Sequence, residues 1–463
     1  MQIEKDTESL MTALKDGLSE HSWPALRDVC LRTEPSVLAD LVPKLDDPDL
    51  AIIFRILPRQ LTTKLFEYLD LDTQKRLLKG LAQEQVARLL NEMSPDDRTA
   101  LLEELPGPVV IALMALLSPS ERQVAQSLLG YPEDSVGRVM TPDYLAIKPE
   151  WTIQEVLRYI RRHGHEKESM NVLYVINEDG LLIDDIRIKD ILLSDPDVTI
   201  RTLMNDAVVF LTVTDDKEVS VTLFRKYDRV VLPVCDSDGF LLGIVTVDDV
   251  LDIVEETDTR EIQQFGGVEA LDEAYMQVTF WHLLSKRAKW LVILFVGELL
   301  TASAMAFFED ELAKAVVLAL FVPLIISSGG NSGSQAATLI IRAMALGEIK
   351  LKDWKAVFIK ESISGLMLGM LLGLMGFIRI MIFGYVGNMY GEHAFLIGVT
   401  VFLTLLGVVL WGTLTGAMLP FVLRRFKLDP ATSSAPFVAT IVDVTGLLIY
   451  FSIAAFILKG TLL

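Results

Sequence analysis

Two different patterns of apolar residues divide the chain. Up to about residue 275 the apolar positions recur in short amphipathic runs, and after it they form long, nearly uncharged stretches. A helix needs about 20 apolar residues to cross a bilayer core about 30 Å thick. The pattern predicts a soluble portion and then a transmembrane domain over 276–463, with a Gly/Ser-rich break inside the second span. The five predicted spans are about 288–308, 312–341, 356–383, 394–423 and 431–458.

The first 130 residues repeat a short helical pattern. Amphipathic runs are interrupted every 11 to 13 residues by proline or by another helix-start residue. Because a short helix pair cannot bury its own apolar face, successive pairs are expected to stack. The pattern predicts an all-α superhelical domain over 1–130. Its helix-start signals are Pro58, Asp72, Gln83, Pro95, Pro106 and Pro119.

Residues 131–247 contain an internal repeat. Asp179-Gly180 followed by LLIDDIRIKDIL is matched 59 residues later by Asp238-Gly239 followed by FLLGIVTVDDVL. Each copy predicts a strand, an Asp-Gly turn, a second strand and a helix start. This order resembles the paired cystathionine-β-synthase-type (CBS) domains, α/β pseudo-dimers with clefts for nucleotides or ions.

The second copy keeps the CBS motif G-x-x-T-x-x-D as Gly243, Thr246 and Asp249. The resemblance implies that Thr246 and Asp249 can hold ATP or another adenine nucleotide, with the Asp on the ribose. In the first copy Asp184 and Arg187 replace the Gly and the Thr. A nucleotide site is therefore expected only at the second copy.

Charge is distributed unevenly between the two portions. Residues 1–275 hold 52 acidic and 28 basic side chains, whereas residues 276–463 hold 10 and 14. The apolar second portion excludes a wholly soluble enzyme, and the acidic first portion has no basic face for nucleic acid. The apolar content also excludes a disordered chain.

Few residues suggest redox or catalytic chemistry. Cys30 and Cys235 are isolated, which is typical of a reducing compartment and of no disulfide framework. The charged N-terminus has no apolar core of a secretory signal peptide. We find no P-loop, nucleophile elbow or HExxH motif and no histidine cluster, so we do not expect an enzyme.

Basic residues between the predicted spans indicate the orientation. Eleven Lys and Arg side chains flank one face of the membrane and two or three flank the other. Because cytoplasmic loops carry the excess of basic residues, the N-terminus is predicted in the cytoplasm. Five spans then place the C-terminus outside the cell (inner) membrane.

The most acidic segment connects the repeat to the first predicted span, over 248–275. Like charges at helical spacing repel each other by a few tenths of a kcal/mol per pair, roughly. One interpretation is a solvated linker face, and the other is a connecting helix whose packing needs divalent cations. Arg260 is its one base, and its ten acids are Asp248, Asp249, Asp252, Glu255, Glu256, Asp258, Glu261, Glu269, Asp272 and Glu273.

Ionisable and polar residues inside the spans are candidate functional groups. Asp443 lies near the middle of the last span, with Thr440 one turn earlier. Asn331 lies in the glycine-rich string of the second span, where packing at a helix interface is the alternative role. Glu298, in the first span, has no obvious partner. Two copies of Asp443 on a twofold axis would suit hydrated Mg²⁺, although Ca²⁺, Mn²⁺ and Co²⁺ are not excluded.

Three sequence strings, and the order in which they occur, are similar to those of the MgtE-type magnesium channels and transporters. They are YPEDSVGRVMTPDY at 131–144, SGGNSGSQAATLIIRAMALGEI at 328–349 and DPATSSAPFVATIVDVTGLLIYF at 429–451. The resemblance covers nearly the whole chain. It implies a homodimer in the membrane, a pore lined by the second and fifth spans, and Mg²⁺ recognition by Asp443. From their own chemistry, Asn331 and Thr440 are expected to offer further oxygen ligands in this pore.

The resemblance also implies that the acidic connecting helix is a plug. Cytoplasmic Mg²⁺ would bind between acids of the superhelix, the CBS pair and the plug, and would close the pore. Asp96 and Asp97 are carried over to this role, although first-turn acids also complement a helix dipole. The corresponding acids of the plug are Asp248, Asp249, Asp252, Glu255, Glu256 and Asp258.

The residues leave two alternatives to a Mg²⁺-gated Mg²⁺ channel. One is a transporter of another divalent metal, such as Co²⁺ or Mn²⁺, coupled to protons through Glu298 or Asp443. The other is a non-conducting membrane sensor of Mg²⁺ or nucleotide. A polar, glycine-rich interior in five spans argues against the sensor, which needs only an anchor.

Overall fold

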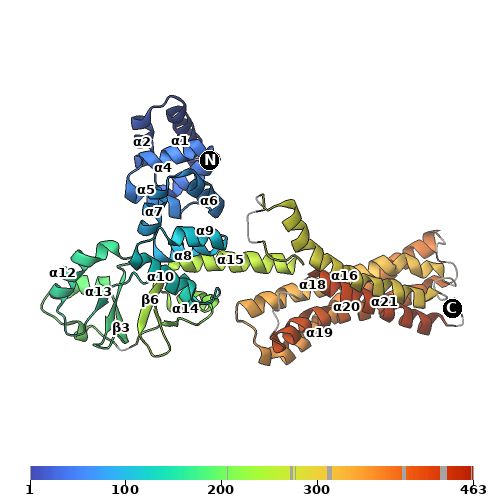
Figure 1. Cartoon of the computed structure of the whole chain (residues 1–463). Helices are drawn as coiled ribbons and strands as arrows, with labels where there is room; N and C mark the ends of the chain where they lie inside the picture. The colour runs from blue at the N-terminus through green and yellow to red at the C-terminus, as the bar shows by residue number, and fades with distance from the viewer. Residues whose placement is uncertain are drawn as a thin grey trace. The chain divides into compact units, whose positions relative to one another are not determined.

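A computed structural model describes residues 2–205, 207–271, 275–276, 278–309, 315–387, 390, 393–427, 435–459 and 461. The chain forms two compact units, Met1–Val254 and Glu255–Leu463. The first unit combines a stack of short helices with two small sheets, and the second is helical (Figure 1).

The superhelix begins the first unit, and its helices follow one another in a stack (Figure 1). A single apolar core made largely of leucine runs through it, from Leu14 to Ala125. The helices start within one residue of the predicted signals, so local helix-start chemistry sets their lengths. They are α1 Gln2–Ser19, α2 Trp23–Arg32, α3 Pro35–Leu41, α4 Asp47–Ile56, α5 Arg59–Glu67, α6 Leu71–Gly80, α7 Gln83–Glu92, α8 Pro95–Glu103, α9 Gly107–Met114 and α10 Pro119–Leu129.

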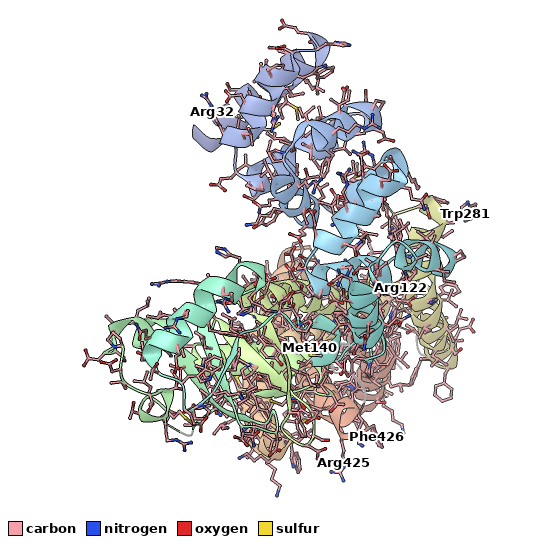
Figure 2. All side chains as sticks on the ribbon, turned by 60° about the vertical axis from the view of Figure 1, so that its left-hand side comes forward. Arg32, Arg122, Met140, Trp281, Arg425 and Phe426 are labelled. Carbon is pink, nitrogen blue, oxygen red and sulfur yellow. The ribbon has the colours of Figure 1, made fainter. Side chains whose placement is uncertain are left out.

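The same side-chain bond recurs in three successive helix pairs. Carbonyl groups in the last turn of a helix lack intrahelical partners, and here a side chain of the following helix donates to one of them. The bonds run from Gln74 Nε2 to Phe66 O (2.9 Å), from Arg98 Nη1 to Leu90 O (3.0 Å) and from Arg122 Nε to Met114 O (2.8 Å; Arg122 is labelled in Figure 2).

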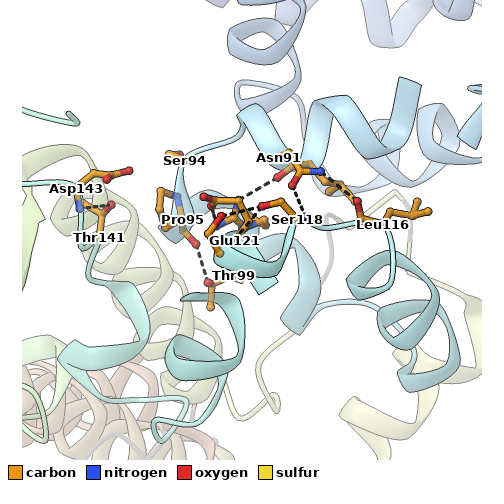
Figure 3. A network of polar contacts seen from close by, with 12 residues as sticks. Asn91, Ser94, Pro95, Thr99, Leu116, Ser118, Glu121, Thr141 and Asp143 are labelled. Carbon is orange, nitrogen blue, oxygen red and sulfur yellow. Dashed lines mark hydrogen bonds and ion pairs between the residues drawn. The ribbon is translucent and has the colours of Figure 1, made fainter. Parts of the chain in front are cut away.

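A polar network fixes the pairs around α8 (Figure 3). The Asn91 side chain accepts from Ser118 N at 2.7 Å and donates to Leu116 O at 3.2 Å. Arg98 is fully buried, and its Nη2 lies 2.6 Å from Glu121 Oε2. These contacts hold the first turn of α8 in place.

Two three-stranded sheets follow the superhelix. In each sheet the first two strands are parallel and the last two antiparallel, in the orders β1-β2-β3 and β4-β5-β6. The strands are β1 Ala146–Ile147, β2 Val172–Ile176, β3 Leu182–Arg187, β4 Leu211–Thr212, β5 Val231–Cys235 and β6 Leu241–Thr246. The accompanying helices are α11 Val136–Val139, α12 Ile153–His163, α13 Ile188–Leu193 and α14 Lys217–Tyr227.

The two sheets meet at their Asp-Gly turns. Leu182 N donates to Gly239 O at 3.0 Å, and Leu241 N donates to Gly180 O at 3.4 Å. Both glycines have positive φ, near +90°, where a side chain would be strained. A shared core that includes Tyr174 and Ile244 completes the pseudo-dimer, so the predicted CBS pair is confirmed.

The second unit contains five helices long and apolar enough to cross a membrane within its described residues. The multidomain fold class predicted from the sequence is therefore confirmed. Helix α15 Val247–Phe265 begins in the first unit and ends in the second. The long helices are α16 Phe280–Phe307, α18 Val322–Ala345, α19 Trp354–Gly387, α20 Ala394–Arg425 and α21 Ala435–Leu458.

The predicted break in the second span is wrong. Helix α18 is continuous through its Gly/Ser string, after one 3-10 segment at Val316–Phe321. Its glycines allow close packing, because a Cβ on Gly333 would lie 2.9 Å from Gly412 O. The string is therefore a helix interface that brings α18 and α20 together.

Candidate metal centres

The first turn of α8 presents two carboxylates. Ser94 precedes the helix, and its N–H donates to Glu67 Oε1 at 3.0 Å, so Glu67 caps this helix from α5. The Ser94 hydroxyl donates to Asp97 Oδ2 at 2.6 Å. Asp96 has a buried Oδ1 with no hydrogen-bond partner among the described residues. The helix start thus gathers three acids in one place.

The first turn of α15 presents two more carboxylates, those of Asp248 and Asp249. Strand β6 ends at Thr246, whose N–H and hydroxyl donate to Asp249 Oδ2 at 3.1 and 2.7 Å. The same hydroxyl also contacts Asp248. These bonds fix the acids of the connecting helix at the point where it leaves the CBS pair.

The two helix starts share one electrostatic environment. Burial and then the field of Asp249 and Asp97 raise the pKa of Asp96 well above its usual value. Burial also raises the pKa of Asp249 to about 7, with Asp248 and Asp97 adding to the effect. We call the group the carboxylate cluster; it comprises Glu67, Asp96, Asp97, Glu168, Asp248 and Asp249.

The remaining members respond in the same direction. Burial raises the pKa of Glu67 to about 7. Burial also raises the pKa of Asp97 and of Glu168, although both side chains are partly exposed, and Asp248 adds to each shift. Lys64 lowers the pKa of Glu67 and of Glu168 but does not outweigh burial. The cluster thus carries more negative charge than its surroundings neutralise.

The cluster is not a finished metal centre. In the described part of the chain, no three Asp, Glu, His or Cys side chains are drawn together tightly enough to enclose an ion. The neighbouring carboxylates and the unpartnered Asp96 oxygen offer the oxygen ligands that Mg²⁺ and Ca²⁺ prefer. An ion would have to draw them together.

The predicted acids of the connecting helix do not all join the cluster. Asp252 and Glu255 are exposed on α15. Glu256 pairs with Arg260 at 2.6 Å, and Asp258 lies 3.7 Å from Arg342 of α18 in the second unit. Asp272 and Glu273 lie outside the described residues.

Sequence reasoning missed Glu67 and Glu168. Glu67 had a signal in the helix repeat, because it caps Ser94 as Asn91 caps Ser118 in the next pair. Glu168 lies in a loop before β2 and reaches the cluster only through the fold, so no local pattern could have found it.

The nucleotide motif is partly occupied by its own side chains. One Asp249 oxygen already accepts both Thr246 donors, and the acids around it repel phosphate. The arrangement fits a ribose hydroxyl but not a triphosphate at the same spot. In the first copy the buried Asp184 accepts from Asp185 N and Asn205 N, at 2.8 and 2.6 Å, so its carboxylate is engaged with backbone groups of its own domain.

The transmembrane candidates lie on α18 and α21. Asp443 Oδ1 is 3.8 Å from where a Cβ on Gly330 would stand, so the carboxylate faces the bare backbone of α18. Asn331, the next residue, is exposed and donates to Ser327 Oγ at 3.3 Å. The Thr440 hydroxyl donates to Pro436 O at 3.0 Å, and its oxygen can still accept or coordinate.

The structure also supplies the partner that Glu298 lacked in the sequence. Its carboxyl is close enough to the Asp443 carboxyl for the two groups to interact electrostatically. A Cβ on the preceding Gly297 would lie 2.5 Å from Thr440 Cγ2, which shows how closely α16 and α21 approach. The carboxyls of Glu298 on α16 and Asp443 on α21 therefore lie near each other, and Asp443 faces the backbone of α18 at Gly330.

Comparison with known proteins identifies the family. A family model described as MgtE, divalent cation transporter, matches residues 322–453, the MgtE intracellular N domain matches 33–134, and CBS domains match 136–196 and 200–256. The chain is 37% identical over 456 residues to the magnesium transporter MgtE of Thermus thermophilus, covering 98% of this chain and 99% of the relative. The chain belongs to the MgtE family.

Other MgtE proteins agree with this assignment. The magnesium transporter MgtE of Bacillus subtilis is 30% identical over 443 residues, with 93% of this chain and 95% of the relative covered. A crystal structure of the cytosolic domain of the Mg²⁺ channel MgtE in complex with ATP is 34% identical, with a TM-score of 0.50. The match covers 52% of this chain and 99% of the chain in that crystal structure. The resemblance drawn from the three sequence strings is confirmed.

Proposed function

We propose that this MgtE-family protein is a Mg²⁺-selective channel that mediates magnesium uptake and is closed by cytoplasmic Mg²⁺. The observation that carries the gating is the carboxylate cluster, where acids from the superhelix, the CBS pair and the first turn of α15 crowd together with little basic compensation. The transported ion follows from the relatives, which are magnesium transporters.

Mutual repulsion makes the cluster sensitive to ions. Without divalent cations its carboxylates favour arrangements in which α8 and the start of α15 move apart. With Mg²⁺ bound between them the packed arrangement is favoured, because the ion binds that state more tightly. Helix α15 continues directly from the cluster into the unit that holds the spans, so the change can reach the pore along the chain.

The pore site is built on Asp443, assisted by Asn331 and Thr440. One carboxylate per chain suffices if two chains pair about a twofold axis, so the proposal includes a homodimer. Mg²⁺ keeps several waters and is usually held by one or two carboxylates. With the N-terminus in the cytoplasm, the membrane potential drives entry by about 2.3 kcal/mol per charge per 100 mV, and no pump chemistry is needed.

A nucleotide is a second ligand of the first unit in this proposal. The related cytosolic domain was solved with ATP, and Asp249 can accept a hydrogen bond from a ribose hydroxyl. The phosphates would have to lie away from Asp96, Asp97 and Asp248. The nucleoside then fits beside Thr246 and Asp249.

Mg²⁺ flux into proteoliposomes tests both parts of the proposal. Asp443→Ala should abolish flux, whereas Glu309→Gln, which removes an acid beyond the end of α16, should leave it unchanged. The double variant Asp96→Asn, Asp97→Asn should conduct at internal Mg²⁺ that closes the parent. Asp40→Asn, an exposed acid of the same superhelix, is its control. A silent Asp443→Ala, or Co²⁺ or Mn²⁺ carried in preference to Mg²⁺, contradicts the proposal.

A further inference from the structure

We infer that Glu298 is a second carboxylate of the transmembrane cation site and sets how tightly the pore holds a divalent ion. The inference rests on the proposed function, because it assigns a role within the same pore. It adds a residue of the first span to a site otherwise built from α18 and α21.

Two contacts fix the register of α16 against α21. Gly297 meets Thr440, and Phe308, the residue after α16, stacks on Phe451 with ring centroids 4.9 Å apart. The sequence separation is the same for both pairs, so the helices run parallel and in step. At a rise of about 1.5 Å per residue, Glu298 and Asp443 lie within about 3 Å of the same height. The electrostatic interaction between the two carboxyls agrees with this register.

A bare glycine faces Asp443, and a hydroxyl unpartnered among the described residues lies on the same helix as Glu298. Gly330 has no side chain to cover Asp443 Oδ1. Thr301 lies one turn beyond Glu298, and its hydroxyl oxygen is buried without a hydrogen-bond partner among the described residues. This hydroxyl oxygen is therefore free to act as a further oxygen ligand one turn from Glu298.

The combined charge of Glu298 and Asp443 favours a divalent cation. Neither carboxylate has an ion pair with a basic side chain in the part of the chain that the structure describes. When both carboxyls are ionised, two neighbouring negative charges in a poorly solvated span repel each other strongly. One divalent cation neutralises both, whereas a monovalent ion leaves one charge. Glu298 therefore favours divalent over monovalent ions and tightens a site that Asp443 would otherwise provide alone.

Transport kinetics of the full protein measure this role. In proteoliposomes, Glu298→Gln should raise the Mg²⁺ concentration for half-maximal flux by about 10- to 100-fold, the effect of losing a supporting group at a metal site. It should also lower the ratio of Mg²⁺ to Na⁺ flux. Glu298→Asp, which keeps the charge, should have a half-saturating Mg²⁺ concentration closer to that of the parent. The control Glu309→Gln should have the same value as the parent. Half-saturation does not depend on how much of each variant is active.

A labelling experiment reads the site without transport. A hydrophobic carbodiimide should modify Glu298 of the parent in metal-free membranes, and Mg²⁺ should protect it, as measured on its peptide by mass spectrometry. Asp443→Asn should weaken that protection.

The two readouts separate the possible failures. Protection in a protein that carries no Mg²⁺ overturns the proposed function and supports the second carboxylate. Flux with parental half-saturation and selectivity in Glu298→Gln, or no protection by Mg²⁺ in a conducting protein, overturns the inference.

Discussion

Asp96 at the start of α8 and Asp249 at the start of α15 lie in each other's electrostatic field, although 153 positions separate them in the sequence. Burial and the charge of Asp249 raise the pKa of Asp96, and burial raises the pKa of Asp249. Like charges held this way oppose the packing that contains them. A cation that binds between the two carboxylates turns their destabilising effect on this packing into a stabilising one.

Neutralising Asp249 should therefore stabilise the metal-free protein. At pH 8 we expect Asp249→Asn to raise its stability by roughly 1–3 kcal/mol, because the buried charge no longer has to form. Millimolar Mg²⁺ should raise the melting temperature of this variant by less than it raises that of the parent. Thermal unfolding with and without Mg²⁺ measures both effects.

The exposed Asp40→Asn is the matched control for that variant and should change stability by less than about 0.5 kcal/mol. A metal-free Asp249→Asn protein less stable than the parent, with an undiminished response to Mg²⁺, would show that the carboxylate cluster is not the ion-sensitive element.

The raised pKa values also predict a pH dependence. Glu67 and Asp249 have pKa values of about 7 in the folded unit, against about 4 in an unfolded chain. Between these values the folded state binds more protons, so stability should fall as pH rises from about 4 to 7 and then level off. Denaturation of the chelator-treated protein across this range tests the sign.

Millimolar Mg²⁺ should remove that slope, because the ion takes the place of the protons. Stability of the metal-free protein that rises between pH 5 and 7 would contradict the burial of these acids. Glu67→Gln should reduce the slope without abolishing it, since Asp249 and Asp96 remain.

Local signals account for what the sequence predicted correctly. Proline and acidic residues stop and start helices within a few positions, so Pro95 and Pro119 mark α8 and α10 directly. The Asp-Gly turns at Gly180 and Gly239 need φ > 0 and so indicate the two hairpins. The membrane-spanning helices were likewise predicted from the length of each apolar stretch, which does not depend on the helices packed against it.

Tertiary packing explains what the sequence could not give. The glycine string of α18 stays helical because α20 and α21 cover it, which no local pattern shows. Asp96, Asp97, Asp248 and Asp249 were predicted as regulatory acids, but Glu168 joins them only through the fold. The partner of Glu298 depends on the register of two helices far apart in the chain, so its role could not be derived from sequence.

The contact between α18 and α20 makes a sharp prediction about glycine. A Cβ on Gly416 would collide with the backbone carbonyl of Gly333, which cannot move without parting the helices. We expect Gly416→Ala to destabilise the membrane unit by about 1–3 kcal/mol or more and to reduce Mg²⁺ flux. Unfolding in detergent and flux per folded protein are the measurements.

Gly407→Ala on the same helix α20 is the control, because its nearest neighbour, Ile449 Cγ2, would lie at 3.4 Å. That substitution should be tolerated, since it makes only an ordinary van der Waals contact. Equal behaviour of the two variants would mean that α18 and α20 are not packed through these glycines.

Arg98 carries the most consequential buried charge of the superhelix. It is fully buried, pairs with Glu121 at 2.6 Å and donates to Leu90 O at 3.0 Å. Arg98→Met should destabilise the protein by about 3–5 kcal/mol, because a partly buried carboxylate and a helix-end carbonyl lose their partner. Arg32→Met, whose pair with Asp28 is 79% and 57% exposed, should cost at most about 1 kcal/mol. Adding Glu121→Gln to Arg98→Met should recover part of the loss in thermal unfolding, and no recovery would mean that Arg98 acts by packing alone.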